Sequence, residues 1–268
     1  MILYFDVFIV SKDNFFNSVN NKQFDSNVQK ASHYRFNNQK YEFKSKLEIT
    51  KYTLLSYSVI NWSEVIIRFE CEDAKDEKDF LIFCKKHYPN AVVENNRSDN
   101  AEKFYNSLKR LINKGNPWIW FCVNNDHPYL SNPNKLSKLI NAANYYEKKY
   151  DKDVSILYSH FSESMNNHSI NQFLYRSYNL NGQKKINEEK DHLLILSERF
   201  IIDSIKIFRL NLLLEIFKKT PSHKRVIRLE HTTSYMINRN ILTVVSKNEL
   251  CRHYDSYSFD ENFKRFSF

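Results

Sequence analysis

Short apolar runs alternate with amphipathic segments along the first 160 residues of the chain. The apolar runs predict buried strands at 3–10, 65–69, 91–94, 118–123 and 154–158. Apolar positions at helical spacing predict helices at 46–59, 76–87, 100–113 and 136–150. This alternation predicts an α/β fold with a mostly parallel central sheet flanked by helices.

The second half of the chain gives fewer signals. The pattern predicts a helix at 201–217, with Asp203 near its start, and strands at 226–229 and 242–245. No Pro- or Ser-rich linker separates the two halves. We therefore expect a single domain over 1–268, in which a helical and short-strand C-terminal part (161–268) completes the unit formed by 1–160.

The composition of the chain favours some classes of partner and excludes some classes of function. The 268 residues carry a net charge of +9, which favours an anionic partner: nucleic acid, a phosphorylated small molecule or an anionic membrane surface. The chain has two glycines, Gly115 and Gly182, so neither a G-x-G-x-x-G dinucleotide turn nor a Walker A loop is present. Classical NAD-binding and P-loop NTPase functions are excluded.

The cysteines and the N-terminal residues indicate the cellular compartment in which the protein works. The four cysteines have no C-x-x-C spacing, and three lie in or beside apolar runs, as is typical of reduced core thiols in a cytoplasmic protein. The first ten residues lack a basic leader and a small-residue cleavage site, which favours a strand over a signal peptide. No apolar run approaches the roughly 20 residues that span a bilayer.

Polar clusters follow the predicted strands of the first half. The clearest case is WIWFCVNNDHPYL (118–130), where an apolar strand stops abruptly in four polar residues. The other clusters are 11–13, 70–73 and 95–97. Ligands of open α/β sheets bind in the crevice at the carboxyl ends of the strands, so we expect these clusters to converge on one site.

The order of these pieces resembles GT-A-type nucleotide-sugar glycosyltransferases of the bacterial capsule and lipopolysaccharide kind. In that family a short Asp-containing motif, usually D-x-D, ends the central strand and holds a divalent cation on the donor diphosphate. Asn124-Asn125-Asp126 matches it as N-x-D. The resemblance covers 1–160 and extends only loosely to the second half. It implies a GT-A-like fold with 1–160 as the nucleotide-sugar-binding half and 161–268 as the acceptor side.

The resemblance also implies roles for residues of the first half. Asp126 would bind Mn²⁺ or Mg²⁺, Asn124 would add a neutral oxygen, and His127 would contact the phosphates. An Asx turn that ends the strand is the structural alternative for the first two. The remaining donor-binding candidates are Ser11, Asp13, Glu72, Asp73 and Arg97. For Glu72 and Asp73 the partner would be ribose or base, with a solvated acidic turn as the alternative.

In the second half, His231 is the candidate for the metal or the diphosphate, and Arg252-His253 is the reserve. Asp203 is the candidate base that deprotonates the acceptor hydroxyl, and Glu198 is the second candidate. A structural histidine and a helix N-cap are the alternatives for His231 and Asp203. Inverting and retaining chemistry both stay open.

The resemblance thus implies a glycosyltransferase that moves a sugar from a nucleotide-diphosphate donor to a capsule or lipooligosaccharide acceptor. A basic surface would suit peripheral association with the inner face of the membrane, where lipid-linked acceptors lie. Two other classes stay open: a basic nucleic-acid-binding or -processing protein, and a non-catalytic scaffold of a glycan-assembly complex.

Overall fold

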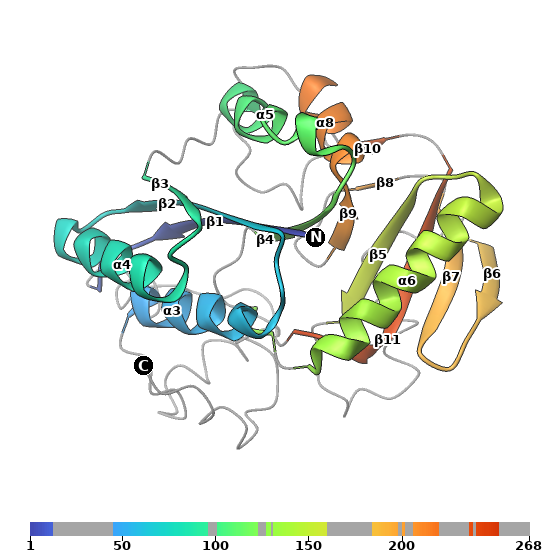
Figure 1. Cartoon of the computed structure of the whole chain (residues 1–268), viewed down its shortest axis with the longest axis horizontal. Coiled ribbons are helices and arrows are strands. Elements are labelled where there is room, and N and C mark those ends of the chain that lie inside the picture. Colours follow the sequence, from blue (N-terminus) through green and yellow to red (C-terminus); the bar gives the residue numbers. More distant parts are fainter. Residues whose placement is uncertain are drawn as a thin grey trace, which may run out of the picture.

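The structure, a computed structural model, forms one mixed sheet with helices on both faces (Figure 1). It describes residues 1–12, 45–95, 101–122, 127–129, 131–159, 184–197, 200–201, 206–219, 236–237 and 240–251. The strands of the main sheet are β1 (Ile2–Ile9), β2 (Glu64–Cys71), β3 (Val92–Glu94), β4 (Trp118–Cys122), β5 (Val154–Ser159), β6 (Lys184–Glu188), β7 (His192–Ser197), β9 (Lys206–Arg209) and β11 (Ile241–Glu249). Two short strands, β8 (Phe200–Ile201) and β10 (Met236–Ile237), pair separately.

The described helices are α3 (Lys46–Ser56), α4 (Ala74–His87), α5 (Ala101–Lys109), α6 (Pro133–Tyr150) and α8 (Leu210–Lys219). Short 3₁₀ turns, η1 (Tyr57–Val59) and η2 (Ile112–Lys114), extend α3 and follow α5. Among these helices, none combines the length and the apolar character that crossing a bilayer requires.

Two buried clusters define the layers. Apolar side chains of α3, α4 and α6 share one core with one face of the sheet, and those of α8 and the end of α5 share a second core with the other. Strand β1 contributes to both cores because its side chains point alternately to the two faces of the sheet. Leu3, Phe5 and Val7 belong to the first core, and Ile2 and Tyr4 belong to the second. The predicted α/β class with a central sheet flanked by helices is confirmed.

The strand order of the sheet is β3-β2-β1-β4-β9-β5-β11-β7-β6. Strands β3, β2, β1 and β4 pair in parallel, and β5 pairs in parallel with β11. Only β9 and β7, among the nine strands in this sheet, run against the rest. From β1 the chain adds β2 and β3 on one side, and then β4 on the other, so the order reverses between β1 and β4.

The predicted helix at 201–217 is wrong in its first part. Residues 206–209 form strand β9, which pairs between β4 and β5, and the helix begins only at Leu210. Arg209 fixes this strand: its guanidinium donates to both carboxylate oxygens of Glu147 on α6 and lies 4.3 Å over the ring of Trp118. These contacts, together with the pairing with β4 and β5, override the helical spacing.

Strands β6 and β7 form a hairpin that the pattern did not predict. In β7 the apolar run Leu193–Leu196 is short and lies between polar residues, although it pairs with β11 along its whole length. In β6 the residues are mostly exposed, because β6 is the last strand at this edge of the sheet. Such an edge strand has little hydrophobic signal, because only one neighbour and one face bury it.

Candidate functional site

The candidate site lies where the carboxyl ends of β1 and β4 meet. In open α/β sheets the crevice for a ligand forms where neighbouring strands connect in opposite directions, because the loops that leave the two strand ends diverge there. The order of strands in this sheet reverses between β1 and β4. The chain leaves β1 at residues 10–12, and it leaves β4 toward His127. Ser11 and His127, the described members of two predicted polar clusters that are candidate site residues, therefore flank the reversal.

A pair of hydrogen bonds joins the ends of β1 and β2. The Ser11 backbone N–H donates to Glu72 Oε2 at 2.9 Å, and the Glu72 N–H donates to the Ile9 carbonyl at 3.1 Å. Because Glu72 is exposed, its carboxylate is accessible to a ligand as well as held by Ser11. The structure thus brings together two of the predicted donor-binding residues.

Asp73 is the N-cap of helix α4. Its Oδ1 accepts hydrogen bonds from the backbone N–H groups of Lys75 at 2.7 Å and Asp76 at 3.1 Å. This cap satisfies two N–H groups that would otherwise lack a partner at the start of the helix. The geometry accounts for the residue structurally, and donor binding by Asp73 stays a prediction.

The carboxyl end of β2 is strongly acidic. Burial, followed by the nearby carboxylates of Asp76, Glu77, Asp73 and Glu70, raises the pKa of the Cys71 thiol to about 12. The carboxylates themselves would repel a phosphate placed here, and they can accept hydrogen bonds from hydroxyl and amine groups. The predicted contact of Glu72 and Asp73 with ribose or base stays a prediction.

A single tyrosine hydroxyl contacts the chain on both sides of residues 123–126. Tyr57 Oη donates to the His127 carbonyl at 2.8 Å and lies 3.7 Å from Cys122 Sγ. Tyr57 is fully buried, and His127 is 2% exposed. The last residue of β4 and the first described residue after it are therefore fixed to the same atom at the end of α3.

Two further contacts anchor the chain beyond His127. The Tyr129 N–H donates to Ser56 Oγ at 2.7 Å, and Tyr129 forms an isolated antiparallel bridge with Cys251. The Tyr129 hydroxyl donates to the carbonyl of Asn132, the N-cap of α6. The segment after β4 is thus attached to α3, to α6 and to Cys251, two residues beyond the end of β11.

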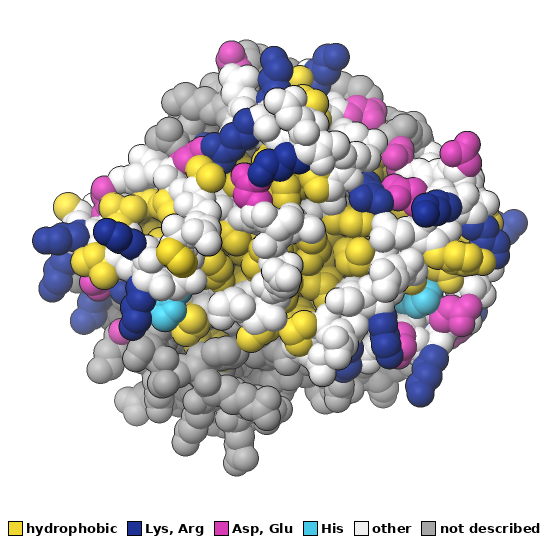
Figure 2. All heavy atoms as spheres, viewed as in Figure 1, with side chains coloured by type: hydrophobic (Ala, Val, Ile, Leu, Met, Phe, Trp, Pro, Cys, Tyr) yellow, Lys and Arg dark blue, Asp and Glu magenta, His cyan; other side chains and the backbone are white. Residues whose placement is uncertain are grey.

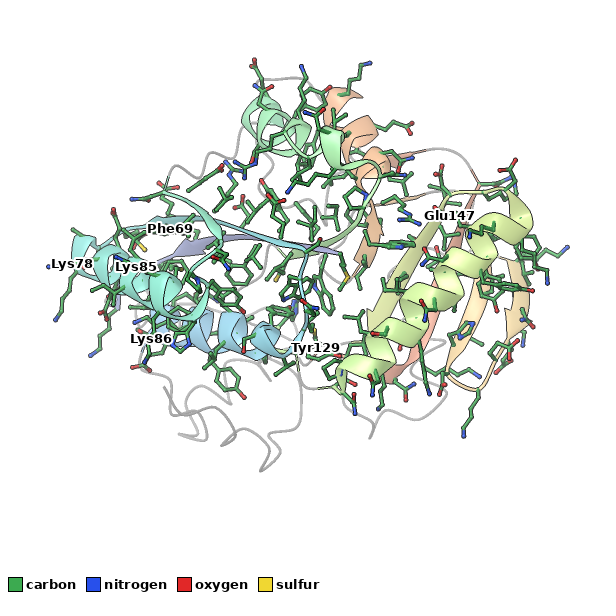
Figure 3. All side chains as sticks on the ribbon, viewed as in Figure 1. Phe69, Lys78, Lys85, Lys86, Tyr129 and Glu147 are labelled. Atoms are coloured by element: carbon green, nitrogen blue, oxygen red, sulfur yellow. The ribbon has the colours of Figure 1, made fainter. Side chains whose placement is uncertain are left out.

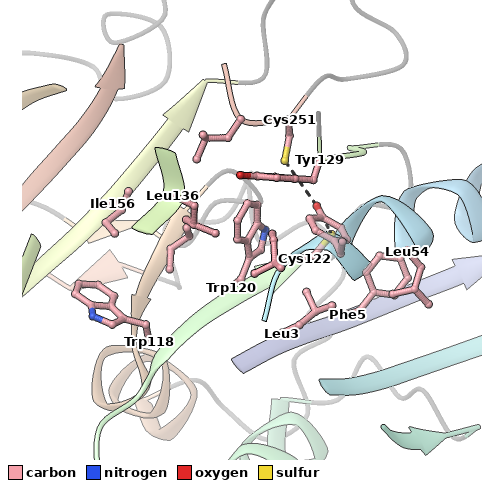
Figure 4. Close-up of a cluster of buried hydrophobic side chains, with 14 of the residues drawn as sticks. Leu3, Phe5, Leu54, Trp118, Trp120, Cys122, Tyr129, Leu136, Ile156 and Cys251 are labelled. Carbon is pink, nitrogen blue, oxygen red and sulfur yellow. Dashed lines mark hydrogen bonds between the residues drawn. The ribbon is translucent and has the colours of Figure 1, made fainter. Parts of the chain in front are cut away.

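Aromatic packing holds this anchor rigid. The ring of Tyr57 lies 5.3 Å from Trp120, 6.2 Å from Trp62 and 6.5 Å from Tyr129, measured between centroids. Figure 4 shows Trp120, Tyr129 and Cys251 gathered at the same place as Cys122. Because these rings fill the space around the hydroxyl, Tyr57 has little freedom to leave the His127 carbonyl.

Seven predicted site residues lie outside the described residues: Asp13, Arg97, Asn124, Asp126, Glu198, Asp203 and His231. Of the other four, Ser11, Glu72 and Asp73 lie at the ends of β1 and β2, and His127 lies buried after β4. Among the residues with described positions, no group of three or more His, Cys, Asp and Glu side chains can hold a metal ion. The metal and base assignments stay predictions.

Ser56 and Tyr57 are contact residues of this site that the sequence pattern did not predict. Both lie in a stretch expected to be an ordinary amphipathic helix, and their partners are about 70 residues away along the chain. No local pattern distinguishes a tyrosine that fills a core from one that also anchors a distant loop. Only the tertiary structure reveals this role.

No protein-family model and no curated protein sequence matches the chain. Among solved structures, it is similar to S. aureus TarS 1-349, with 13% identity and a TM-score of 0.42 over 78% of this chain and 57% of that one. It is also similar to 4-diphosphocytidyl-2C-methyl-D-erythritol synthase, with 10% identity and a TM-score of 0.37 over 80% and 85% of the two chains. The chain thus spans little more than half the length of the first.

Proposed function

We propose that this protein is a glycosyltransferase that binds a nucleotide-diphosphate sugar at the carboxyl ends of β1, β2 and β4. The observation that carries the proposal is the reversal of strand order between β1 and β4, with the predicted polar clusters leaving both strands. A crevice at such a reversal is where open α/β sheets bind nucleotides.

The chemistry of the strand ends would orient the donor. The acidic corner at Glu72 and Asp73 would accept hydrogen bonds from ribose or base. The diphosphate would then lie on the β4 side, next to residues 124–127. There the Tyr57 anchor at His127 supports the chain that follows the N-x-D motif.

Asn124 and Asp126 have the oxygen donors that Mg²⁺ and Mn²⁺ prefer, and His231 would complete the set. A divalent cation bound there would neutralise the charge that develops on the leaving diphosphate. The chain's own residues would then orient the donor, and Asp203 or Glu198 would take the proton from the acceptor hydroxyl. The proposed acceptor is a capsule or lipooligosaccharide glycan, reached by peripheral association with the inner face of the membrane.

Nucleotide binding tests the proposal directly. We expect UDP, GDP or CMP to raise the melting temperature of the full chain and to give a calorimetric binding signal, stronger with Mn²⁺ present. Asp126→Ala should abolish the metal-dependent part, whereas Asp191→Ala, in the turn between β6 and β7, should leave it unchanged. If no nucleotide gives a response with or without Mn²⁺, the proposal is wrong.

The described aromatic residues do not favour the nucleic-acid alternative. The largest buried side chains include Tyr4, Tyr52, Tyr57, Trp120 and Tyr129, which fill the core and cannot stack on bases. Much of the aromatic content that suggested this alternative therefore has a structural role.

A further inference from the structure

Helix α4 has an exposed basic face with two apolar side chains at its middle. Lys78, Lys85 and Lys86 are exposed, and between them Leu81 is 38% and Ile82 58% exposed. Residues 78, 82, 85 and 86 follow helical spacing and lie on one side of the helix. We call these five residues the basic face. Figure 3 labels its three lysines on α4, at the end of the molecule away from α6.

The second half of this face, from Leu81 to Lys86, has no acid among its own residues. The segment from Phe80 to His87 contains no carboxylate, and Asp79 is paired with Lys51 at 3.3 Å. The acids of the first turn, Asp76 and Glu77, precede the face along the helix. Figure 2 shows Lys and Arg side chains gathered around hydrophobic ones over this end of the molecule.

Helix stability explains only part of this arrangement. Lysines in the last turn interact favourably with the helix dipole, which accounts for Lys85 and Lys86. It does not account for Ile82, because Phe80, Phe83 and Cys84 already supply the buried side of α4. Helix α6 offers a contrast: its last turn also has two lysines, but there Lys149 Nζ lies 5.5 Å from the centre of the exposed Tyr145 ring.

We propose that the basic face of α4 binds an anionic membrane surface. The lysines would lie among anionic headgroups, and Leu81 and Ile82 would enter the boundary between headgroups and acyl chains. A nucleic acid or an acidic polysaccharide would use the lysines but would gain little from two aliphatic side chains. The observations therefore favour a lipid surface over another polyanion.

This inference rests on the proposed function for its biological setting, namely the lipid-linked acceptor, but its observations are independent of the donor site. Each lysine near an anionic leaflet strengthens binding by about fivefold, so three lysines give weak, reversible binding. Such an enzyme could reach acceptors along the membrane without a fixed anchor.

Vesicle sedimentation of the full chain tests the inference. We expect binding to phosphatidylcholine vesicles that contain phosphatidylglycerol, weaker binding as salt rises, and little binding to phosphatidylcholine alone. The double variant Lys85→Gln/Lys86→Gln should weaken binding by roughly 20- to 30-fold, and Ile82→Asn by roughly threefold or more. The matched control, Lys148→Gln/Lys149→Gln, removes the same charge from the last turn of α6 and should bind like wild type.

Three results would overturn the inference: no preference for anionic vesicles, equal weakening by the α4 and α6 pairs, or an Ile82→Asn variant that binds like wild type. The last of these would mark a general polyanion surface, to be identified with an oligonucleotide of matched charge. Because the substituted side chains are exposed, circular dichroism should show unchanged folding. Nucleotide binding by the same variants reports on the donor site, so failure of either proposal is recognised separately.

Discussion

The guanidinium of Arg68 donates a hydrogen bond to the carboxylate of Asp6 at 3.0 Å, and both side chains are buried. The two residues lie directly opposite each other on the parallel strands β1 and β2, and Glu94 on β3 is the next in register. Arg68 Nε lies 3.2 Å from Glu94 Oε2. A line of alternating charges therefore crosses three strands inside the sheet.

Removing one charge of this line should lower the stability of the protein strongly. Arg68→Met leaves the Asp6 carboxylate buried without its cation, which should lower the free energy of unfolding by about 3–5 kcal/mol. Urea unfolding measures the loss. The double variant Asp6→Leu/Arg68→Met removes both charges and should be more stable than Arg68→Met alone. Lys185→Met, which breaks an exposed pair with Glu188, should cost much less.

Removing the Tyr57 hydroxyl should lower both the stability of the protein and its affinity for nucleotide. Tyr57→Phe keeps the aromatic packing and removes the hydrogen bond to His127, so the free energy of unfolding should fall by about 1–2 kcal/mol. Nucleotide affinity should fall with it, because the chain after the N-x-D motif loses its anchor.

The matched control is Tyr88→Phe. Its hydroxyl is also buried and donates to a carbonyl, that of Leu54 on α3. This variant should lose similar stability but should bind nucleotide like wild type. Equal loss of nucleotide affinity in both variants would show that the effect of Tyr57→Phe reflects general stability alone.

Two substitutions at Asp73 distinguish its role as a helix cap from its predicted role in donor binding. Asp73→Ala should lower the free energy of unfolding by about 1 kcal/mol, because two N–H groups at the start of α4 lose their acceptor. Asp73→Ser keeps a capping oxygen without the charge and should retain stability. If Asp73 contacts ribose or base, calorimetry should show weaker nucleotide binding by Asp73→Ser. Unchanged binding would assign Asp73 to the cap only.

His192 should make stability depend on pH. Burial lowers the pKa of its imidazole below the ordinary value of 6.5, while Nε2 lies 3.1 Å from the hydroxyl of Tyr146. Below pH 6.5 the unfolded state therefore binds more protons than the folded state, so stability falls as the pH drops until the folded-state pKa is passed. Urea unfolding between pH 7.5 and 5 should show this loss.

His192→Gln provides the comparison, because glutamine can still form a hydrogen bond but does not titrate in this range. We expect the variant to lose less stability on acidification than wild type. The same loss in both proteins would assign the pH dependence to other groups, such as His87, whose pKa is also lowered by burial.

The elements of the first half could be predicted because each carries its own local signal. The β4 run Trp118–Cys122 is apolar throughout and buried, and α4 has acids in its first turn and bases in its last turn, as the helix dipole favours. Where a residue's state depends on distant partners, the prediction failed. Residues 206–209 have helical spacing but form β9, because β4 and β5 both offer unpaired backbone groups to them.

The sequence by itself determined the class of fold, the polar clusters at the strand ends and the absence of glycine-rich phosphate loops. Those features depend on residue type and on spacing within one segment. The tertiary structure alone decided that the order of strands reverses between β1 and β4, that Glu72 meets Ser11, and that Tyr57 fixes the chain after β4. The two hydrogen-bonded contacts join residues about 60 to 70 positions apart. The pairing of β1 with β2 brings Glu72 to Ser11, and the packing of the end of α3 against the sheet brings Tyr57 to His127.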